Sequence, residues 1–154
     1  MDTTVALEAI KRLKYAYLRT LDLKEFDVLG TLLLPEVTAS YEDGKTVLEG
    51  RDAIVRWLTS VLGDPGIVTE HHCHHPEIDF LSDTEAAGTW YLQDRVIVAA
   101  ADVEIAGTAF YADRYRLTDE GWRISHTGYR RVFEEHRTHS TYAVRSFTSR
   151  FSAG

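Results

Sequence analysis

Four long strand-like segments follow one another through the second half of the chain, and they constrain its fold more than any other feature. They cover residues 68–80, 86–100, 103–118 and 121–136, and only the short segments SDTE, ADVE and TDEGW separate them. Because connections this short join antiparallel neighbours, the pattern predicts a continuous antiparallel meander.

The first half of the chain carries helical patterns instead. Apolar residues recur at helical spacing from Leu7 to Leu21, and a third helix is expected from Arg51. Between them, KEFDVLGTLLL is expected to form a short second helix that Pro35 ends, because the residue before a proline avoids helical geometry. Helices followed by a long meander predict an α+β fold, in which three N-terminal helices pack on one face of a strongly curved antiparallel sheet. The twist of such a sheet bends it into a cone.

Length and composition narrow the class of protein. With 154 residues, the chain is expected to form a single domain over residues 1–136, followed by a tail over residues 137–154 without a clear period. The net charge of −7 argues against a nucleic-acid partner and against a polybasic membrane surface. A single cysteine cannot form an internal disulfide, and no apolar run approaches membrane-spanning length, so a cytoplasmic location is expected.

The segment TEHHCHHPEID holds four histidines and the one cysteine within five consecutive positions. Side chains alternate along a strand, so one face would carry His71, Cys73 and His75, and the other His72 and His74. Three ligands on one face make a metal site geometrically possible, but the paired spacings of strong zinc motifs are absent. We therefore expect no metal. Alternation alone does not decide which histidine faces a cavity, because a bulge at Pro76 would reset it.

Five fragments in order resemble the SnoaL-like members of the nuclear transport factor 2 superfamily, which include scytalone dehydratase, ketosteroid isomerase and lindane dehydrochlorinase. They lie between about residues 5 and 135 and read IKRLKYAYLRTLDLKEFDVL, LEGRDAIVRWL, TEHHCHHPEIDF, WYLQD and GTAFYADRYRLTDEGWRIS. The resemblance implies the cone-shaped, cystatin-like α+β fold of that superfamily, with no cofactor.

The same resemblance implies a set of catalytic residues. In the eliminating relatives a histidine removes a proton from carbon and an aspartate holds it, and these positions match His71 and Asp22. Tyr41 and Tyr17 match positions at which relatives place tyrosines that face the substrate. A neutral imidazole accepts a proton near neutral pH, and a carboxylate on its other nitrogen stabilises the imidazolium that forms. The residues expected to bind the substrate are Trp57, Trp90, Asp94, Tyr111 and Asp113.

Two readings of function stay open. The first is a cofactor-independent enzyme, either a dehydratase-like lyase or an isomerase. In this enzyme His71 abstracts a proton from a small hydrophobic cyclic substrate of polyketide, steroid or terpenoid type. The second is a non-catalytic ligand-binding or assembly module of the same fold, because a fold does not determine its function. A homodimer is expected in either case, formed through the outer face of the sheet at apolar positions such as Ile97 and Val98.

Overall fold

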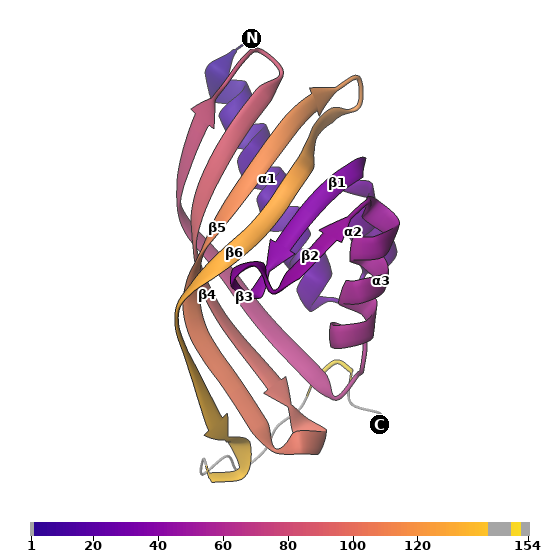
Figure 1. Ribbon diagram of the computed structural model, residues 1–154, viewed down its shortest axis with the longest axis vertical. Coiled ribbons are helices and arrows are strands. Elements are labelled where there is room, and N and C mark those ends of the chain that lie inside the picture. Colours follow the sequence, from indigo (N-terminus) through magenta and orange to yellow (C-terminus); the bar gives the residue numbers. More distant parts are fainter. Residues whose placement is uncertain (1, 142–148, 152–154) are drawn as a thin grey trace.

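The structure is a computed structural model that describes residues 2–141 and 149–151, and it folds them into three α-helices and one six-stranded sheet (Figure 1). The helices are α1 (Thr3–Asp22), α2 (Phe26–Thr31) and α3 (Arg51–Leu62). The strands are β1 (Leu33–Tyr41), β2 (Thr46–Glu49), β3 (Ile67–Phe80), β4 (Glu85–Val98), β5 (Val103–Thr118) and β6 (Gly121–Thr138). The expected α+β class and the four long strands are confirmed.

The strands follow the order β2-β1-β6-β5-β4-β3 across the sheet. Strands β3 to β6 form the expected antiparallel meander, and β1 pairs with β2 in antiparallel fashion. However, β1 runs parallel to β6, so the sheet is mixed rather than antiparallel throughout. A tight turn forces two strands to be antiparallel, whereas most of the chain separates β1 from β6 and leaves their direction free.

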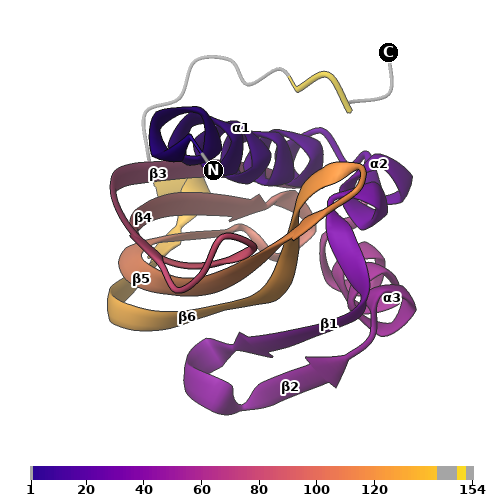
Figure 2. The ribbon, with the colours of Figure 1, turned by 90° about the horizontal axis from the view of Figure 1, so that it is seen from above.

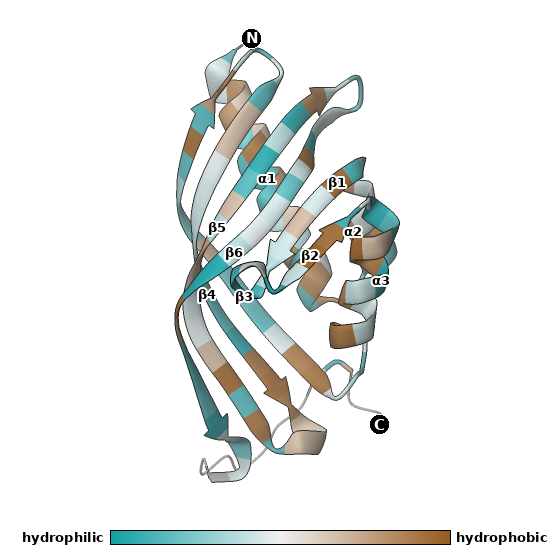
Figure 3. Cartoon of the chain, in the orientation of Figure 1, coloured by the Kyte–Doolittle hydropathy of each residue, from teal (hydrophilic) through white to brown (hydrophobic). Residues whose placement is uncertain are grey.

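The sheet curls strongly, and the helices close its concave side (Figure 2). Helix α1 packs along β3, and α3 packs beside β1. Apolar side chains from both layers form one core, in which Ile10, Leu29, Ile54, Leu92 and Ile124 are almost completely buried. Buried and more exposed positions alternate along much of β4 and β5, as expected for a sheet with one covered face. Both hydrophilic and hydrophobic residues lie along the long strands (Figure 3).

The expectation for the second helix is only partly correct. Helix α2 ends at Thr31, and β1 begins at Leu33, so Pro35 lies inside a strand instead of terminating a helix. Proline has no N–H to give to a ladder, and Pro35 falls within the stretch where the pairing of β1 with β6 shifts its register. Leu33 and Val37 are fully buried, and this burial stabilises the extended conformation.

The C-terminal boundary also differs slightly from the expectation. Strand β6 continues to Thr138, beyond the expected end of the domain at residue 136, and a short 3-10 turn follows over His139–Thr141. Most of the expected tail over residues 137–154 lies outside the described residues. Within the part of the chain that the structure describes, no helix is both long and apolar enough to cross a membrane.

Candidate active site

A cavity of about 630 Å³ lies between the curved sheet and helices α1 and α3. One part of its wall is apolar and consists of Leu58, Leu62, Ile67, Val96, Val98 and Ile105. Another part is aromatic and consists of Tyr17, Tyr41, Trp57, Tyr111 and Tyr129. A mostly apolar pocket with a few converging polar groups is the usual form of a small-molecule site.

Asp22 and His71 meet beside this cavity, although 49 residues separate them in the sequence. Asp22 ends helix α1, His71 lies in the middle of β3, and Oδ1 of Asp22 is 2.6 Å from Nδ1 of His71. The imidazole is on the cavity wall and its side chain is only 9% exposed. The carboxylate lies on the other side of the ring, where it borders a shallow groove between α1 and β3.

This geometry defines the tautomer of a neutral His71. A carboxylate accepts hydrogen bonds, so Nδ1 of His71 carries the proton that it donates to Asp22. The other ring nitrogen, Nε2, then has a free lone pair. A neutral imidazole held in this way, on the wall of the cavity, has the tautomer that a general base requires.

Two further donors hold the Asp22 carboxylate. The hydroxyl of Thr69 donates to Oδ1 at 2.7 Å, and the backbone N–H of His71 donates to Oδ2 at 3.0 Å. Thr69 was not among the residues expected at the site. Its only signal in the sequence is its position two residues before His71, which places both side chains on the same face of β3.

Two tyrosine hydroxyls lie together on the cavity wall. The Oη atoms of Tyr17 and Tyr41 are 3.1 Å apart, and both residues are almost completely buried. Burial raises the pKa of both phenols well above their ordinary range, because it disfavours the phenolate. Both groups therefore stay protonated and act as hydrogen-bond donors. Since one hydroxyl donates to the other, one O–H remains free for a ligand at any moment.

Aromatic rings support this tyrosine pair. Trp57 of α3 stacks on Tyr41 with ring centroids 5.1 Å apart and an interplanar angle of 15°. Tyr129 of β6 contacts both Tyr41 and Tyr111, with centroid distances of 5.8 and 5.7 Å. Tyr129 was not expected at the site, because the sequence pattern does not distinguish it from other apolar positions of a long strand.

Asp94 reaches the cavity with its charge already paired. It lies opposite His71 in the register of β3 with β4, and its carboxylate forms two hydrogen bonds with the guanidinium of Arg131, at 2.5 and 2.7 Å. Arg131 also pairs with Glu134 at 3.1 Å. The arginine charge is therefore neutralised by carboxylates of the protein. Arg131 was missed by the sequence-based reasoning, because its partner lies 37 residues away.

Two of the expected substrate-binding residues, Trp90 and Asp113, do not lie on the wall of this cavity. Both side chains are directed to the concave side of the sheet, but helix α1 covers that stretch. Trp90 is completely buried and contacts the ring of Tyr15. Asp113 is 2.8 Å from the ammonium of Lys14, and both side chains are fully buried. The family resemblance does not indicate how far a helix extends over this face of the sheet.

The buried charge of Asp113 belongs to a short polar chain beneath α1. The indole N–H of Trp90 donates to the hydroxyl of Tyr115, which donates to Oδ2 of Asp113, and each distance is 2.8 Å. The ammonium of Lys14 lies over the ring of Tyr111, 3.3 Å from its centroid. These contacts join α1 to β4 and β5 and support the cavity wall at Tyr111.

The histidine cluster divides between the two sides of the sheet. His71 and Cys73 face inward, whereas His72 and His74 are exposed on the outer side. The expectation that His75 shares the face of His71 is wrong, because His75 has a φ of 49° and the pairing with β4 shifts after His74. This is a bulge, and it resets the alternation. Among the described residues, no group of three or more His, Cys, Asp or Glu side chains is arranged to hold a metal ion.

Cys73 is unsuited to nucleophilic chemistry. Burial raises the pKa of its thiol to about 11, because the thiolate would be poorly solvated there. The thiol therefore remains neutral at physiological pH.

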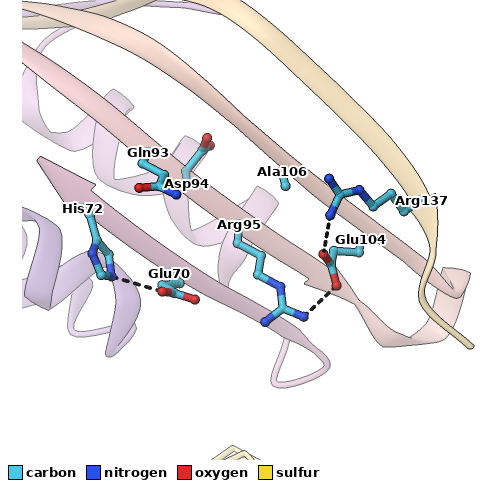
Figure 4. A pocket seen from close by; sticks show the side chains of 8 residues that line it. All are labelled: Glu70, His72, Gln93, Asp94, Arg95, Glu104, Ala106 and Arg137. Carbon is cyan, nitrogen blue, oxygen red and sulfur yellow. Dashed lines mark hydrogen bonds and ion pairs between the residues drawn. The ribbon is translucent and has the colours of Figure 1, made fainter. Parts of the chain in front are cut away.

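A separate groove lies on the outer side of the sheet and is lined mainly by charged residues (Figure 4). Glu104 accepts a hydrogen bond from Arg95 at 2.7 Å and lies 3.7 Å from Arg137. His72 pairs with Glu70 at 3.1 Å. These contacts stabilise the outer surface. His71 does not line this groove, whereas Asp94 lines both the groove and the cavity.

The fold and the cavity define a cone-like α+β domain with a histidine–aspartate pair at a partly open cavity that has an apolar and aromatic wall. The family model described as a SnoaL-like domain matches residues 2–128, and the chain belongs to this family.

Solved structures with the same fold cover nearly the whole chain. A putative scytalone dehydratase from Novosphingobium aromaticivorans is 24% identical, with a TM-score of 0.79 over 98% of this chain and 97% of its own. A hexachlorocyclohexane dehydrochlorinase, LinA-type3 from Novosphingobium barchaimii, is 17% identical, with a TM-score of 0.80 over 96% and 97%. A protein of unknown function with a cystatin-like fold from Nostoc punctiforme is 18% identical, with a TM-score of 0.68 over 84% and 92%. These similarities show the fold.

Proposed function

We propose that the protein is a cofactor-independent lyase of the dehydratase type, or an isomerase, acting on a small hydrophobic cyclic substrate. The observation that carries the proposal is the 2.6 Å contact between Asp22 and His71, with the imidazole on the wall of an apolar cavity. The dehydratase and dehydrochlorinase named among the structural neighbours favour elimination over isomerisation.

In the proposed reaction, Nε2 of His71 removes a proton from a carbon next to a carbonyl group. The electrons of that C–H bond move towards the carbonyl oxygen, where Tyr41 or Tyr17 donates a hydrogen bond to the developing negative charge. Asp22 stabilises the imidazolium. In a dehydration, the C–O bond to the leaving hydroxyl then breaks, a C=C bond forms, and the imidazolium returns its proton to release water. No oxidant or reductant is consumed.

Glu42, Asp43, Asp94 and Glu134 line the cavity together with Lys45 and Arg131, and this excess of carboxylates disfavours an anionic substrate. The guanidinium of Arg131 is paired with Asp94 and Glu134, so it is not free to bind a carboxylate or phosphate. The apolar wall formed by α3 and the ends of β3, β4 and β5 suits a hydrocarbon ring system. A cytoplasmic location and a homodimer are part of this proposal, and the single cysteine is compatible with a reducing compartment.

Deuterium exchange tests the proposal whatever the leaving group of the substrate is, because it follows only the proton on carbon. The protein is incubated in D₂O with a panel of cyclic ketones and β-hydroxyketones of polyketide, steroid and terpenoid type. NMR follows exchange at the carbon next to the carbonyl, and mass spectrometry follows loss of water. We expect exchange or elimination with at least one compound, and none with the His71→Ala variant. Compounds that bind and raise the melting temperature without any exchange would instead support the ligand-binding module.

A further inference from the structure

We infer that Thr69 is a positioning residue for the proposed base, because its hydroxyl fixes the carboxylate of Asp22 in the plane that holds the Nδ1–H tautomer of His71. This inference rests on the proposed function and adds a third member to the Asp22–His71 pair. Thr69 lies in β3 and is only 8% exposed, and its Oγ1 is 2.7 Å from Oδ1 of Asp22.

The two oxygens of Asp22 have different roles. Oδ1 accepts from both the hydroxyl of Thr69 and Nδ1 of His71, at 2.7 and 2.6 Å, whereas Oδ2 accepts from the backbone N–H of His71 at 3.0 Å. All three donors come from one stretch of β3. Together they prevent the carboxylate from rotating about its Cβ–Cγ bond.

Such a restraint is needed at this position. Asp22 is the last residue of α1, and its side chain is 25% exposed towards the groove that Arg19 and Leu23 also line. Water in this groove competes for the carboxylate oxygens. With only the two donors of His71, Oδ1 could turn towards water, and the imidazole would lose the acceptor that keeps its proton on Nδ1. The hydroxyl of Thr69 occupies that second acceptor site on Oδ1.

A purely structural role for Thr69 makes a different prediction. Threonine is common in strands because its branched side chain packs well, and valine has the same shape with at least equal strand propensity. If packing alone explained Thr69, valine would replace it without consequence for His71. The hydroxyl is therefore the feature to test, and Thr69→Val removes it at nearly constant volume. Thr69→Ser keeps the hydroxyl and loses the methyl group.

The test measures the tautomer of His71 by NMR in the substrate-free protein, with ¹⁵N-labelled histidine at about pH 8, where an ordinary histidine is neutral. The chain has seven histidines, and the His71→Ala variant identifies the resonances of His71. We expect wild type and Thr69→Ser to show a protonated Nδ1 with a slowly exchanging proton and an unprotonated Nε2. In Thr69→Val, the Nδ1 proton should exchange rapidly with water and the two ring nitrogens should shift towards averaged values.

Thr108→Val is the matched control, because Thr108 is also a buried strand threonine and its hydroxyl has no hydrogen-bond partner among the described residues. It should leave the resonances of His71 unchanged.

If Thr69→Val keeps the wild-type tautomer and proton exchange, the inference is wrong, whether or not the protein is an enzyme. If Thr69→Val does not fold, comparison of Thr69→Ser with Thr69→Ala decides the question in the same way. Once a substrate has been identified, Thr69→Val should lower kcat on the order of 10-fold at unchanged KM. Thr69→Ser should have a kcat close to that of the wild type.

Discussion

The carboxylate of Asp22 and the imidazole of His71 are joined through Oδ1 and Nδ1 at 2.6 Å, and they link the end of α1 to the middle of β3. The imidazole lines both the cavity and the groove between α1 and β3, whereas the carboxylate lines only the groove. An acceptor on the side of the ring away from the cavity is the arrangement in which a carboxylate stabilises an imidazolium without contacting the substrate.

Substitution of this pair should show that its two members act as a unit. Asp22→Asn should keep the fold but reduce activity on the order of 10³-fold or more, because an amide cannot stabilise the imidazolium in the same way. His71→Ala should reduce it as much, and the double variant should lose little beyond either single variant. Steady-state kinetics on a substrate found by deuterium exchange provides the measurement. Losses that multiply in the double variant would mean that the two residues act independently.

Tyr17 and Tyr41 should contribute to catalysis as hydrogen-bond donors through their neutral hydroxyl groups. Tyr41→Phe should reduce activity on the order of 10²-fold, the scale for one lost donor to an oxyanion. Because burial raises the pKa of Tyr41 and Tyr17, their contribution should persist up to about pH 10, where an ordinary phenol is already half ionised. Tyr129→Phe is the control, since Tyr129 lines the cavity outside the hydroxyl pair. A decline in activity above neutral pH that is absent from Tyr41→Phe would contradict this role.

Local patterns in the sequence were sufficient for most of the fold. The four long strands could be predicted because only short turn-forming segments separate them. The parallel pairing of β1 with β6 could not, since Thr38 and His126 lie 88 residues apart and no turn connects them. The residues of β1 and β6 carry no local sequence signal that indicates this pairing.

The candidate site was predictable only in part. The pairing of Asp22 with His71 was expected from the family resemblance, and the structure brings their side chains together. Trp90 and Asp113 were expected to bind the substrate, but α1 covers both side chains, and the extent of a helix over a sheet is a tertiary property. The bulge at His75 likewise reflects the register between β3 and β4, which a single strand pattern does not contain.

The thiol of Cys73 should react slowly with alkylating reagents. The thiolate is the reactive form, and the raised pKa of about 11 keeps its fraction small near neutral pH. The rate of alkylation by iodoacetamide should therefore continue to rise between about pH 8 and pH 10, whereas an ordinary thiol approaches its plateau near pH 9. Cys73 is the only cysteine, so mass spectrometry of the intact protein gives the rate directly. A plateau near pH 9 would show that the thiol is better solvated than its burial indicates.

The outer side of the sheet should form the interface of a homodimer, although through residues other than those expected. Val98 lines the cavity and Ile97 is only 4% exposed, so neither is available on the outer surface. Phe110 and Phe133 are 44% and 50% exposed on the outward positions of β5 and β6. Exposed aromatic groups of this kind are typical of association surfaces.

Sedimentation velocity at micromolar concentration checks this expectation. Wild type should sediment as a dimer, and Phe110→Lys should shift it towards the monomer. Val47→Lys should not, because Val47 is 65% exposed but lies on β2, at the far edge of the sheet. A monomeric wild type would exclude the dimer.

Removing only one charge of the buried pair Lys14–Asp113 should destabilise the fold more than removing both charges. Lys14→Met should lower the free energy of unfolding by about 3 to 5 kcal/mol, because it leaves the carboxylate of Asp113 buried without its cation. The double variant Lys14→Met/Asp113→Leu should recover part of this loss, since it removes both charges together, although the hydroxyl of Tyr115 then loses its acceptor.

Lys11→Met on the same helix is the control and should leave the unfolding midpoint almost unchanged, because Lys11 pairs with Glu8 at the surface. Urea denaturation of the four proteins measures these differences. A double variant less stable than Lys14→Met would mean that Asp113 stabilises the fold mainly through Tyr115 and Trp90 instead of through Lys14.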